Sequence, residues 1–209
     1  MMSNLYEEYN NVIVQGKIVT EKKFNHEIYG EKFYVYDLEV ARLSNVTDII
    51  PILVSERLLC DNELKQDMLV EVQGQYRSYN STTEEKSRLV LMVFVKEYNI
   101  IEEINIAKPQ NEITLNGFLC KKPVFRTTPL GRDIVDMLLA VNRAYNKSDY
   151  IPLIAWGRNA NYCKDLIIGT NIKIVGRIQS RQYEKKYTDG TIEKRRAYEV
   201  SVDKLELID

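Results

Sequence analysis

The chain has 209 residues, enough for one large domain or two of about 100, and its 44% hydrophobic and 28% charged content is typical of soluble globular proteins. Because it has neither a roughly 18-residue apolar span nor a signal peptide, a membrane protein is excluded and a cytoplasmic one is predicted. The net charge of −1 is uneven: residues 1–110 carry 12 Lys and Arg against 18 Asp and Glu, and residues 111–209 carry 17 against 12, so a polyanion would meet the second half.

An internal repeat divides the chain into two similar halves. The offset between matched residues is 101 at first, 102 by the fourth predicted strand and about 108 near the end. The order of these identities predicts two homologous domains, residues 1–104 and 110–209, and the short linker between them predicts that they pack together. The matched pairs include Gly16 with Gly117, Leu38 with Leu139, Arg42 with Arg143, Pro51 with Pro152, Gly74 with Gly176, and Met92 with Val200.

Each copy predicts the same succession of strands. The second strand alternates apolar and polar residues, so that Tyr34, Tyr36, Leu38 and Val40 share one buried face. Five strands with a short helix between the third and fourth is the order of the OB-fold, a small, partly open Greek-key barrel. The predicted class is therefore all-β, with two tandem five-stranded OB-fold barrels. The predicted strands are 12–20, 33–43, 50–55, 69–79 and 89–98, then 113–119, 134–142, 151–156, 171–183 and 197–205, with helices near 58–64 and 160–166.

Catalytic and metal-binding patterns are lacking in the sequence. The three cysteines are odd in number and show no CxxC spacing, which is typical of reduced cytosolic thiols. The single histidine, His26, has no nucleophile motif beside it, and no GxGxxG, P-loop or HExxH run occurs. We therefore predict that the chain is not an enzyme and has no cofactor and no metal site.

The second copy resembles the bacterial single-stranded DNA-binding protein family over nearly all of residues 111–208. That resemblance implies sequence-independent binding and protection of single-stranded DNA in replication, recombination or repair. It also implies a homodimer, because the tandem pair is similar to the two-domain arrangement in which two chains supply four OB domains. The quoted stretches are LNGFLCKKPVFRTTPLG at Leu115–Gly131, LLAVNR at Leu138–Arg143, IAWGRNA at Ile154–Ala160, GTNIKIVGRIQSRQYE at Gly169–Glu184, and DGTIEKRRAYEVSVDKLEL at Asp189–Leu207.

The family usually ends in a disordered region with an acidic tip that recruits other enzymes. This sequence stops at Ile208-Asp209, directly after its last predicted strand. We therefore expect a form that lacks the acidic tail and its recruiting role.

Binding a single strand without sequence preference requires flat aromatic faces for the bases and cations for the phosphates. The family's stacking positions map onto Tyr145, Tyr150, Trp156 and Tyr183, and Tyr187 in the following loop is a further candidate. The candidate phosphate-binding residues are Arg126, Arg143, Arg158, Arg177, Arg181, Lys185 and Lys186. Any one of these aromatics alone would more often be barrel packing, and any one of the cations an ordinary solvated side chain. It is their joint occurrence that favours binding.

The first copy has lost the aromatic residues at the matching positions. It carries Ser44, Ile49, Ser55 and, approximately, Ser81 there, and its net charge opposes a polyanion. We therefore expect the first barrel to be a scaffold or dimerisation domain with little or no DNA contact. Two of its tyrosines, Tyr76 and Tyr79, remain candidates for stacking a base.

Two other function classes fit the sequence less well. One is an OB-fold protein–protein adaptor of a primosome or of a mobile-element replication system, docking through the acidic first barrel. The other is an RNA-binding OB module. Binding to poly(dT) separates the adaptor from the leading prediction, and competition between dT and U oligomers separates RNA from DNA.

Overall fold

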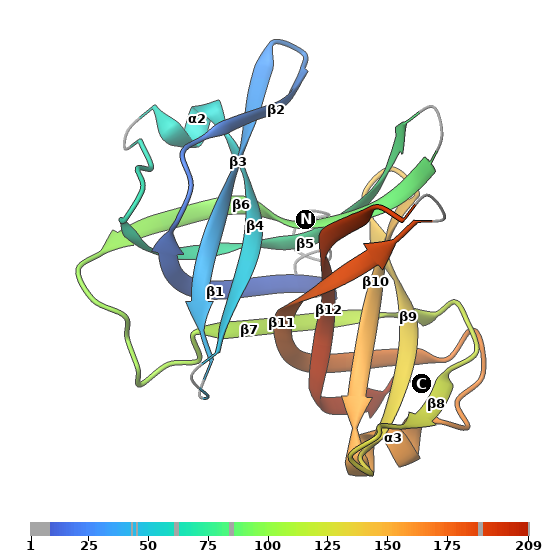
Figure 1. The fold of residues 1–209 in the computed structure, drawn as a ribbon. Helices are drawn as coiled ribbons and strands as arrows, with labels where there is room; N and C mark the ends of the chain where they lie inside the picture. The colour runs from blue at the N-terminus through green and yellow to red at the C-terminus, as the bar shows by residue number, and fades with distance from the viewer. Residues whose placement is uncertain are drawn as a thin grey trace.

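The computed structural model describes residues 9–42, 44, 46–60, 63–83, 86–187 and 190–208. Its two halves repeat one order of elements, shown in Figure 1. The N-terminal half contains β1 (Asn10–Ile18), β2 (Lys23–Ile28), β3 (Glu31–Ala41), β4 (Thr47–Ser55), α2 (Glu56–Leu59), β5 (Leu69–Thr83) and β6 (Lys86–Ile101). The C-terminal half contains β7 (Asn111–Leu119), β8 (Val124–Thr127), β9 (Asp133–Arg143), β10 (Lys147–Trp156), α3 (Gly157–Cys163), β11 (Asn171–Lys186) and β12 (Ile192–Leu207).

The tandem OB-like architecture predicted from the repeat is confirmed. In each half the first strand pairs with two others, β1 with β3 and β5, and β7 with β9 and β11. A parallel pairing completes each barrel, β4 with β6 and β10 with β12. The short strands β2 and β8 were not predicted; each pairs only with the strand that follows it, β3 or β9.

The interior of each barrel is filled by the apolar face of the alternating strands. Tyr36, Leu38 and Val40 of β3 are fully buried, as their spacing predicts. Their counterparts Met137, Leu139 and Val141 of β9 are buried as well. These residues belong to one hydrophobic cluster that continues through both halves.

Glycine allows the long fourth strand of each half to bend. The register of β11 against β12 shifts between Val175 and Gly176, and the register of β5 against β6 shifts between Gln73 and Gly74. A Cβ on Gly176 would lie 2.2 Å from the carbonyl oxygen of Ser201, closer than side chains can approach. The bend at each of these glycines is therefore a β-bulge with close backbone contact.

The two halves share one continuous sheet. β1 pairs antiparallel with β7, and Val12 lies opposite Ile113 in that pairing. These two residues are themselves counterparts in the repeat, so a pseudo-two-fold axis passes beside them. The prediction that the halves pack together is confirmed, and they do so through their first strands, β1 and β7 (Figure 1).

The strand register corrects one detail of the sequence repeat. Ile52 pairs with Val93 in the first half, and its counterpart Leu153 pairs with Val200 in the second. The counterpart of Val200 is therefore Val93 and not Met92, which makes the final offset 107.

Among the described residues, the helices α2 and α3 have four and seven residues, and no helix is long and apolar enough to cross a membrane.

Candidate nucleic-acid interface

β10 turns two large aromatic rings away from the barrel. Ile151, Leu153 and Ala155 point into the core, so the alternation of the strand places Tyr150 and Trp156 on the outer face. Tyr150 is 46% exposed and Trp156 is 39% exposed. Both rings can therefore offer a face to a ligand.

Gly157 ends the strand immediately after Trp156. Its φ of +54° lies in the left-handed region that favours glycine, and it lets the chain turn directly into α3. Trp156 thus stays extended, with φ −120° and ψ 147°, at the edge of the outer face.

Trp156 shares a surface depression with three arginines. A depression of about 420 Å³ is lined by Trp156 together with Arg132, Arg177 and Arg42, the last of which comes from the N-terminal half. Arg177 forms an ion pair with Asp203 at 3.8 Å. The side chain of Arg177 is also partly exposed to solvent. The combination of an indole face and several guanidinium groups suits a nucleotide unit, with a base on the ring and a phosphate on the cations.

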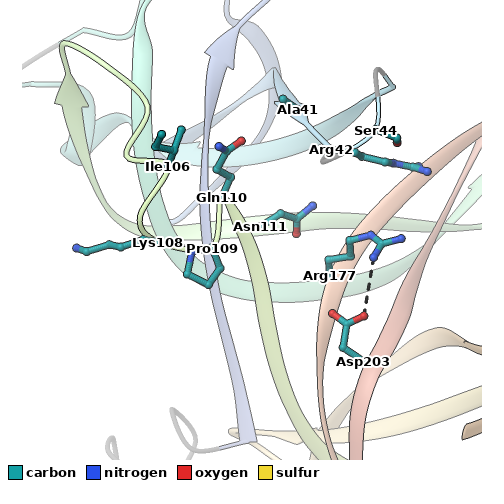
Figure 2. A pocket seen from close by; sticks show the side chains of 10 residues that line it. All are labelled: Ala41, Arg42, Ser44, Ile106, Lys108, Pro109, Gln110, Asn111, Arg177 and Asp203. Atoms are coloured by element: carbon teal, nitrogen blue, oxygen red, sulfur yellow. Dashed lines mark ion pairs between the residues drawn. The ribbon is translucent and has the colours of Figure 1, made fainter.

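This depression is continuous with a cleft between the two halves. Figure 2 shows Arg42, which directly follows β3, and Arg177 of β11 lining the same cleft as Lys108 of the linker. The cleft has a volume of about 530 Å³ and also contains Asp203, paired with Arg177. Positive side chains therefore continue from Trp156 into the space between the halves.

Tyr183 lies on β11, farther along the same outer face. It is 38% exposed and lies opposite Arg195 of β12. Tyr183, Arg195 and Arg196 line a second depression of about 380 Å³, together with Pro152 of β10. The structure therefore brings Tyr150, Trp156 and Tyr183 onto one side of the C-terminal half.

Two of the predicted aromatics lie in turns. Tyr145 is 93% exposed between β9 and β10, and its φ of 62° is uncommon for a residue other than glycine. Tyr187 is half-buried after β11, with Lys185 5.3 Å and Arg195 5.9 Å from the ring centre. Its hydroxyl bonds to Glu193 and accepts from Arg195, so Tyr187 already has cations on its ring.

Several predicted phosphate-binding arginines have carboxylate partners at the surface. Arg126 is bidentate to Asp136, with Nε 2.7 Å from Oδ2, and this hydrogen bond raises the pKa of Arg126. Arg181 is 3.9 Å from Glu199. An exposed pair such as Arg126–Asp136 contributes roughly 0–1 kcal/mol, so a phosphate can replace the carboxylate of Asp136 at small cost. Arg158, at the start of α3, and Lys186, at the end of β11, are also exposed.

Arg143 takes part in a contact between the halves. Its Nη1 is 3.4 Å from Oδ1 of Asp149, which also accepts the backbone N–H of Ser78 at 2.8 Å. The backbone N–H of Tyr150 donates in return to Oγ of Ser78 at 2.7 Å. Burial raises the pKa of Asp149 despite these partners. We call this group the Ser78 contact.

The same contact occurs a second time with the halves exchanged. Asp48 accepts the backbone N–H of Ser180 at 2.6 Å, and the N–H of Ile49 donates to Oγ of Ser180 at 3.0 Å. Arg42 binds Asp48 through Nε at 2.7 Å and Nη2 at 2.6 Å, which raises the pKa of Arg42. We call this group the Ser180 contact.

Sequence reasoning missed several members of this face. Arg132 and Arg42 beside Trp156 were not predicted, although the match of Arg42 to Arg143 was a signal of an equivalent role. Of the two N-terminal tyrosines proposed as stacking candidates, Tyr76 is completely buried and cannot stack a base, so that candidate is wrong. The other, Tyr79, is 41% exposed.

No group of three or more metal-ligating side chains forms within the described ranges.

Comparison with known proteins places this geometry in a family. A model of the single-strand binding protein family matches residues 110–208. The chain is 33% identical over 84 residues to single-stranded DNA-binding protein B of Bacillus subtilis (strain 168), spanning 35% of this chain and 72% of that protein. It is 35% identical over 81 residues to single-stranded DNA-binding protein 1 of Staphylococcus aureus (strain COL), spanning 35% of this chain and 48% of that protein.

The whole fold also has a counterpart among solved structures. A deletion mutant of the single-stranded DNA binding protein from Thermus aquaticus superposes with a TM-score of 0.75, covering 95% of this chain and 94% of that one at 19% identity. The match therefore includes both halves and shows a common fold. The chain spans about half the length of the Staphylococcus aureus relative.

Proposed function

This chain belongs to the single-strand binding protein family, and from that premise we propose that it binds and protects single-stranded DNA without sequence preference, through the outer face of its C-terminal half. The setting would be replication, recombination or repair. The family is one of binding proteins, so no catalytic step is involved.

The observation that carries the proposal is the exposure of three rings on one side of a barrel. Trp156, Tyr150 and Tyr183 are each between 38% and 46% exposed, although large aromatics usually bury most of their surface. Stacking is tolerant of sequence because every base has a π-face. Tyr145 and Tyr187 would extend the same surface at its two turns.

Cations beside the rings would follow the phosphates. Arg177 lies beside Trp156, and Arg181 precedes Tyr183 by two residues on the same face of β11. Arg126, Arg143, Arg158, Lys185 and Lys186 complete the proposed set. The positive balance of residues 111–209 supports this assignment, because it places the attraction for a polyanion in the same half as the rings.

We propose that residues 1–104 act mainly as a scaffold. Their Ser55 and Ser81 stand where the C-terminal half has Trp156 and Tyr183, and the acidic balance of this half works against extensive contact with a polyanion. Two chains would associate as a homodimer with four barrels. Light scattering measures this directly: a mass of twice 24.4 kDa supports the dimer, and a monomer mass contradicts it.

The test of the function is the affinity of Trp156→Ala for labelled oligo(dT), measured by fluorescence anisotropy at low salt. Loss of one stacking platform weakens binding by roughly 1–3 kcal/mol. Tyr162→Ala is the matched control, because Tyr162 is a 55% exposed aromatic on α3 that is not among the proposed stacking residues. Wild-type protein that does not bind oligo(dT) would contradict the proposal and favour a protein–protein adaptor. Stronger binding to oligo(U) would favour RNA.

A further inference from the structure

The Ser78 contact and the Ser180 contact have the same backbone chemistry. In each, a serine on the fourth long strand of one half donates its N–H to a buried aspartate of the other half and accepts an N–H through its hydroxyl. The aspartates, Asp149 and Asp48, are 1% and 0% exposed. The pseudo-two-fold axis therefore repeats one rigid joint between the halves.

The side chains around the two joints are different. At the Ser78 contact the next residues are Tyr79 on β5 and Tyr150 on β10, which are 41% and 46% exposed. At the Ser180 contact the corresponding residues are Arg181 and Ile49. Only the first joint carries an aromatic ring from each half.

Both rings line one depression with two cations. Tyr79, Tyr150, Arg143 and Lys147 surround a space of about 290 Å³ at the Ser78 contact. The backbone N–H of Ser78 donates to the carboxylate of Asp149, and the Ser78 hydroxyl accepts the backbone N–H of Tyr150, so the strands that carry the rings are fixed relative to each other. The spacing of the two ring-bearing positions is thus set before any ligand arrives.

The charge of this site favours an anion. Arg143 and Arg77 both approach Asp149, at 3.4 and 4.0 Å, so one carboxylate faces two guanidinium groups. Lys147 adds a further positive charge at the rim. Within the described residues the Nε of Arg77 has no hydrogen-bond partner, so this cation is incompletely satisfied by the protein.

We propose that the Ser78 contact is a composite nucleotide-binding subsite, built from both halves, that takes one unit of a single strand as it passes from the C-terminal to the N-terminal half. The base lies against Tyr79 or Tyr150, and the phosphate lies against Arg143 and Lys147. The inference rests on the proposed function, because the strand reaches the subsite along the face that carries Tyr150 and Trp156.

A groove on the N-terminal half continues from this subsite. Ser78, Tyr79 and Arg143 also line a space of about 650 Å³ that extends to Phe94 and His26. Arg77 lies 5.3 Å from the centre of the Phe94 ring there. A strand that crosses the Ser78 contact therefore meets more rings and cations on the N-terminal half, at positions other than those matched in the sequence repeat.

The test is a titration of Tyr79→Ala with oligo(dT) strands whose lengths range from about 4 to about 30 nucleotides, because one barrel covers about 4–16. Tyr79→Phe keeps the ring, and Tyr162→Ala removes an exposed ring on α3 instead. Thermal unfolding midpoints confirm that each variant is folded.

We expect Tyr79→Ala to bind the shortest strands that quench Trp156 as tightly as wild type does, and to lose about 5- to 150-fold in affinity for the longest ones. Tyr79→Phe and Tyr162→Ala should match wild type at every length. In the double variant Tyr79→Ala/Tyr150→Ala, the losses on long strands should not be additive, because the two rings share one subsite.

The inference is overturned if Tyr79→Ala matches Tyr162→Ala at all lengths while Trp156→Ala still weakens binding. That result would leave the proposed function intact and confine the strand to the C-terminal half. Absence of binding by the wild type at every length would instead overturn the proposed function and the subsite with it.

Discussion

Strand alternation decides which aromatic residues of this molecule can meet a ligand. Tyr36 and Tyr76 face the barrel interior and are completely buried, whereas Tyr150 and Trp156 occupy outward positions. Residue type alone does not separate these two groups. Residues an even number of positions apart in a strand point to the same face, so Tyr150 and Trp156 could be predicted to lie on the outer face together.

Other residues of the candidate site could not be read from the sequence. Tyr79 was one of two N-terminal tyrosines considered for base stacking. The sequence does not tell which face of β5 it occupies, because the strand bends at Gly74 and the bulge shifts the alternation of faces beyond it. Arg42 lies beside Trp156 because the pairing of β1 with β7 brings the two halves together. Contacts between residues far apart in sequence leave no local pattern.

The cysteines provide a prediction about pH. Cys60 is exposed and Cys163 is buried, and burial raises the pKa of the Cys163 thiol to about 11. With a thiol reagent at pH 8, Cys60 should react rapidly, and Cys163 should react only as fast as the protein opens. Cys60→Ser removes the fast phase.

The same shift has a consequence for stability. The folded state holds the Cys163 proton more tightly than the unfolded state, whose thiol has the ordinary value of 9.0. The contribution of the Cys163 thiol to the free energy of unfolding is therefore complete below pH 9 and is lost as the pH rises through about 11.

In the labelling experiment, rapid reaction of Cys163 at pH 8 without unfolding would contradict the buried placement.

At the scale of elements, the long strands were predictable and the short ones were not. β3 and β9 alternate between buried and half-buried residues, and this alternation is the signal that sequence analysis detects. β2 has one half-buried residue among exposed ones, and all four residues of β8 are exposed. A strand without a buried face has no period-2 pattern, so both segments were predicted as loops.

The long hairpins also exceed their predicted ends. β11 continues to Lys186 and β12 begins at Ile192, whereas the sequence predicted 171–183 and 197–205. Charged residues occupy most of the added positions, so hydrophobicity gave no signal there. Backbone pairing alone extends this ladder, to the pair of Lys186 with Ile192.

The Ser180 contact yields a prediction about stability. Asp48→Ala leaves Arg42 and the backbone N–H of Ser180 without their carboxylate, and breaking a buried pair from one side costs about 3–5 kcal/mol. Urea unfolding measures this loss. The control is Asp203→Ala, whose exposed pair with Arg177 should contribute at most about 1 kcal/mol. Equal effects of the two substitutions would contradict the buried joint.

At the scale of the whole molecule, the repeat predicted two barrels but not how they join. One sheet passes from β1 to β7, and two equivalent serine–aspartate contacts lie on either side of the pseudo-two-fold axis. The repeat and the resemblance were sufficient for the fold and for most of the C-terminal face. The joint could not be predicted, because buried aspartates in strands give no sequence signal of a partner in the other half.

Electrostatic attraction between the protein and the phosphates predicts a salt dependence. The logarithm of the association constant should fall with the logarithm of salt concentration by about 0.7 for each phosphate neutralised. Arg181→Ala removes one cation that is 63% exposed in its side chain and should reduce the slope by about 0.7. Anisotropy titrations between about 50 and 200 mM salt measure it, and an unchanged slope would remove Arg181 from the phosphate path.

The most direct measurement is the fluorescence of Trp156 during titration with oligo(dT) at low salt. Trp156 is the only tryptophan of the chain, so any change reports on this one ring. If bases stack on the outer face of the C-terminal half, the emission should be quenched and should saturate. Anisotropy that shows oligo(dT) bound while Trp156 emission stays constant would contradict stacking at this face.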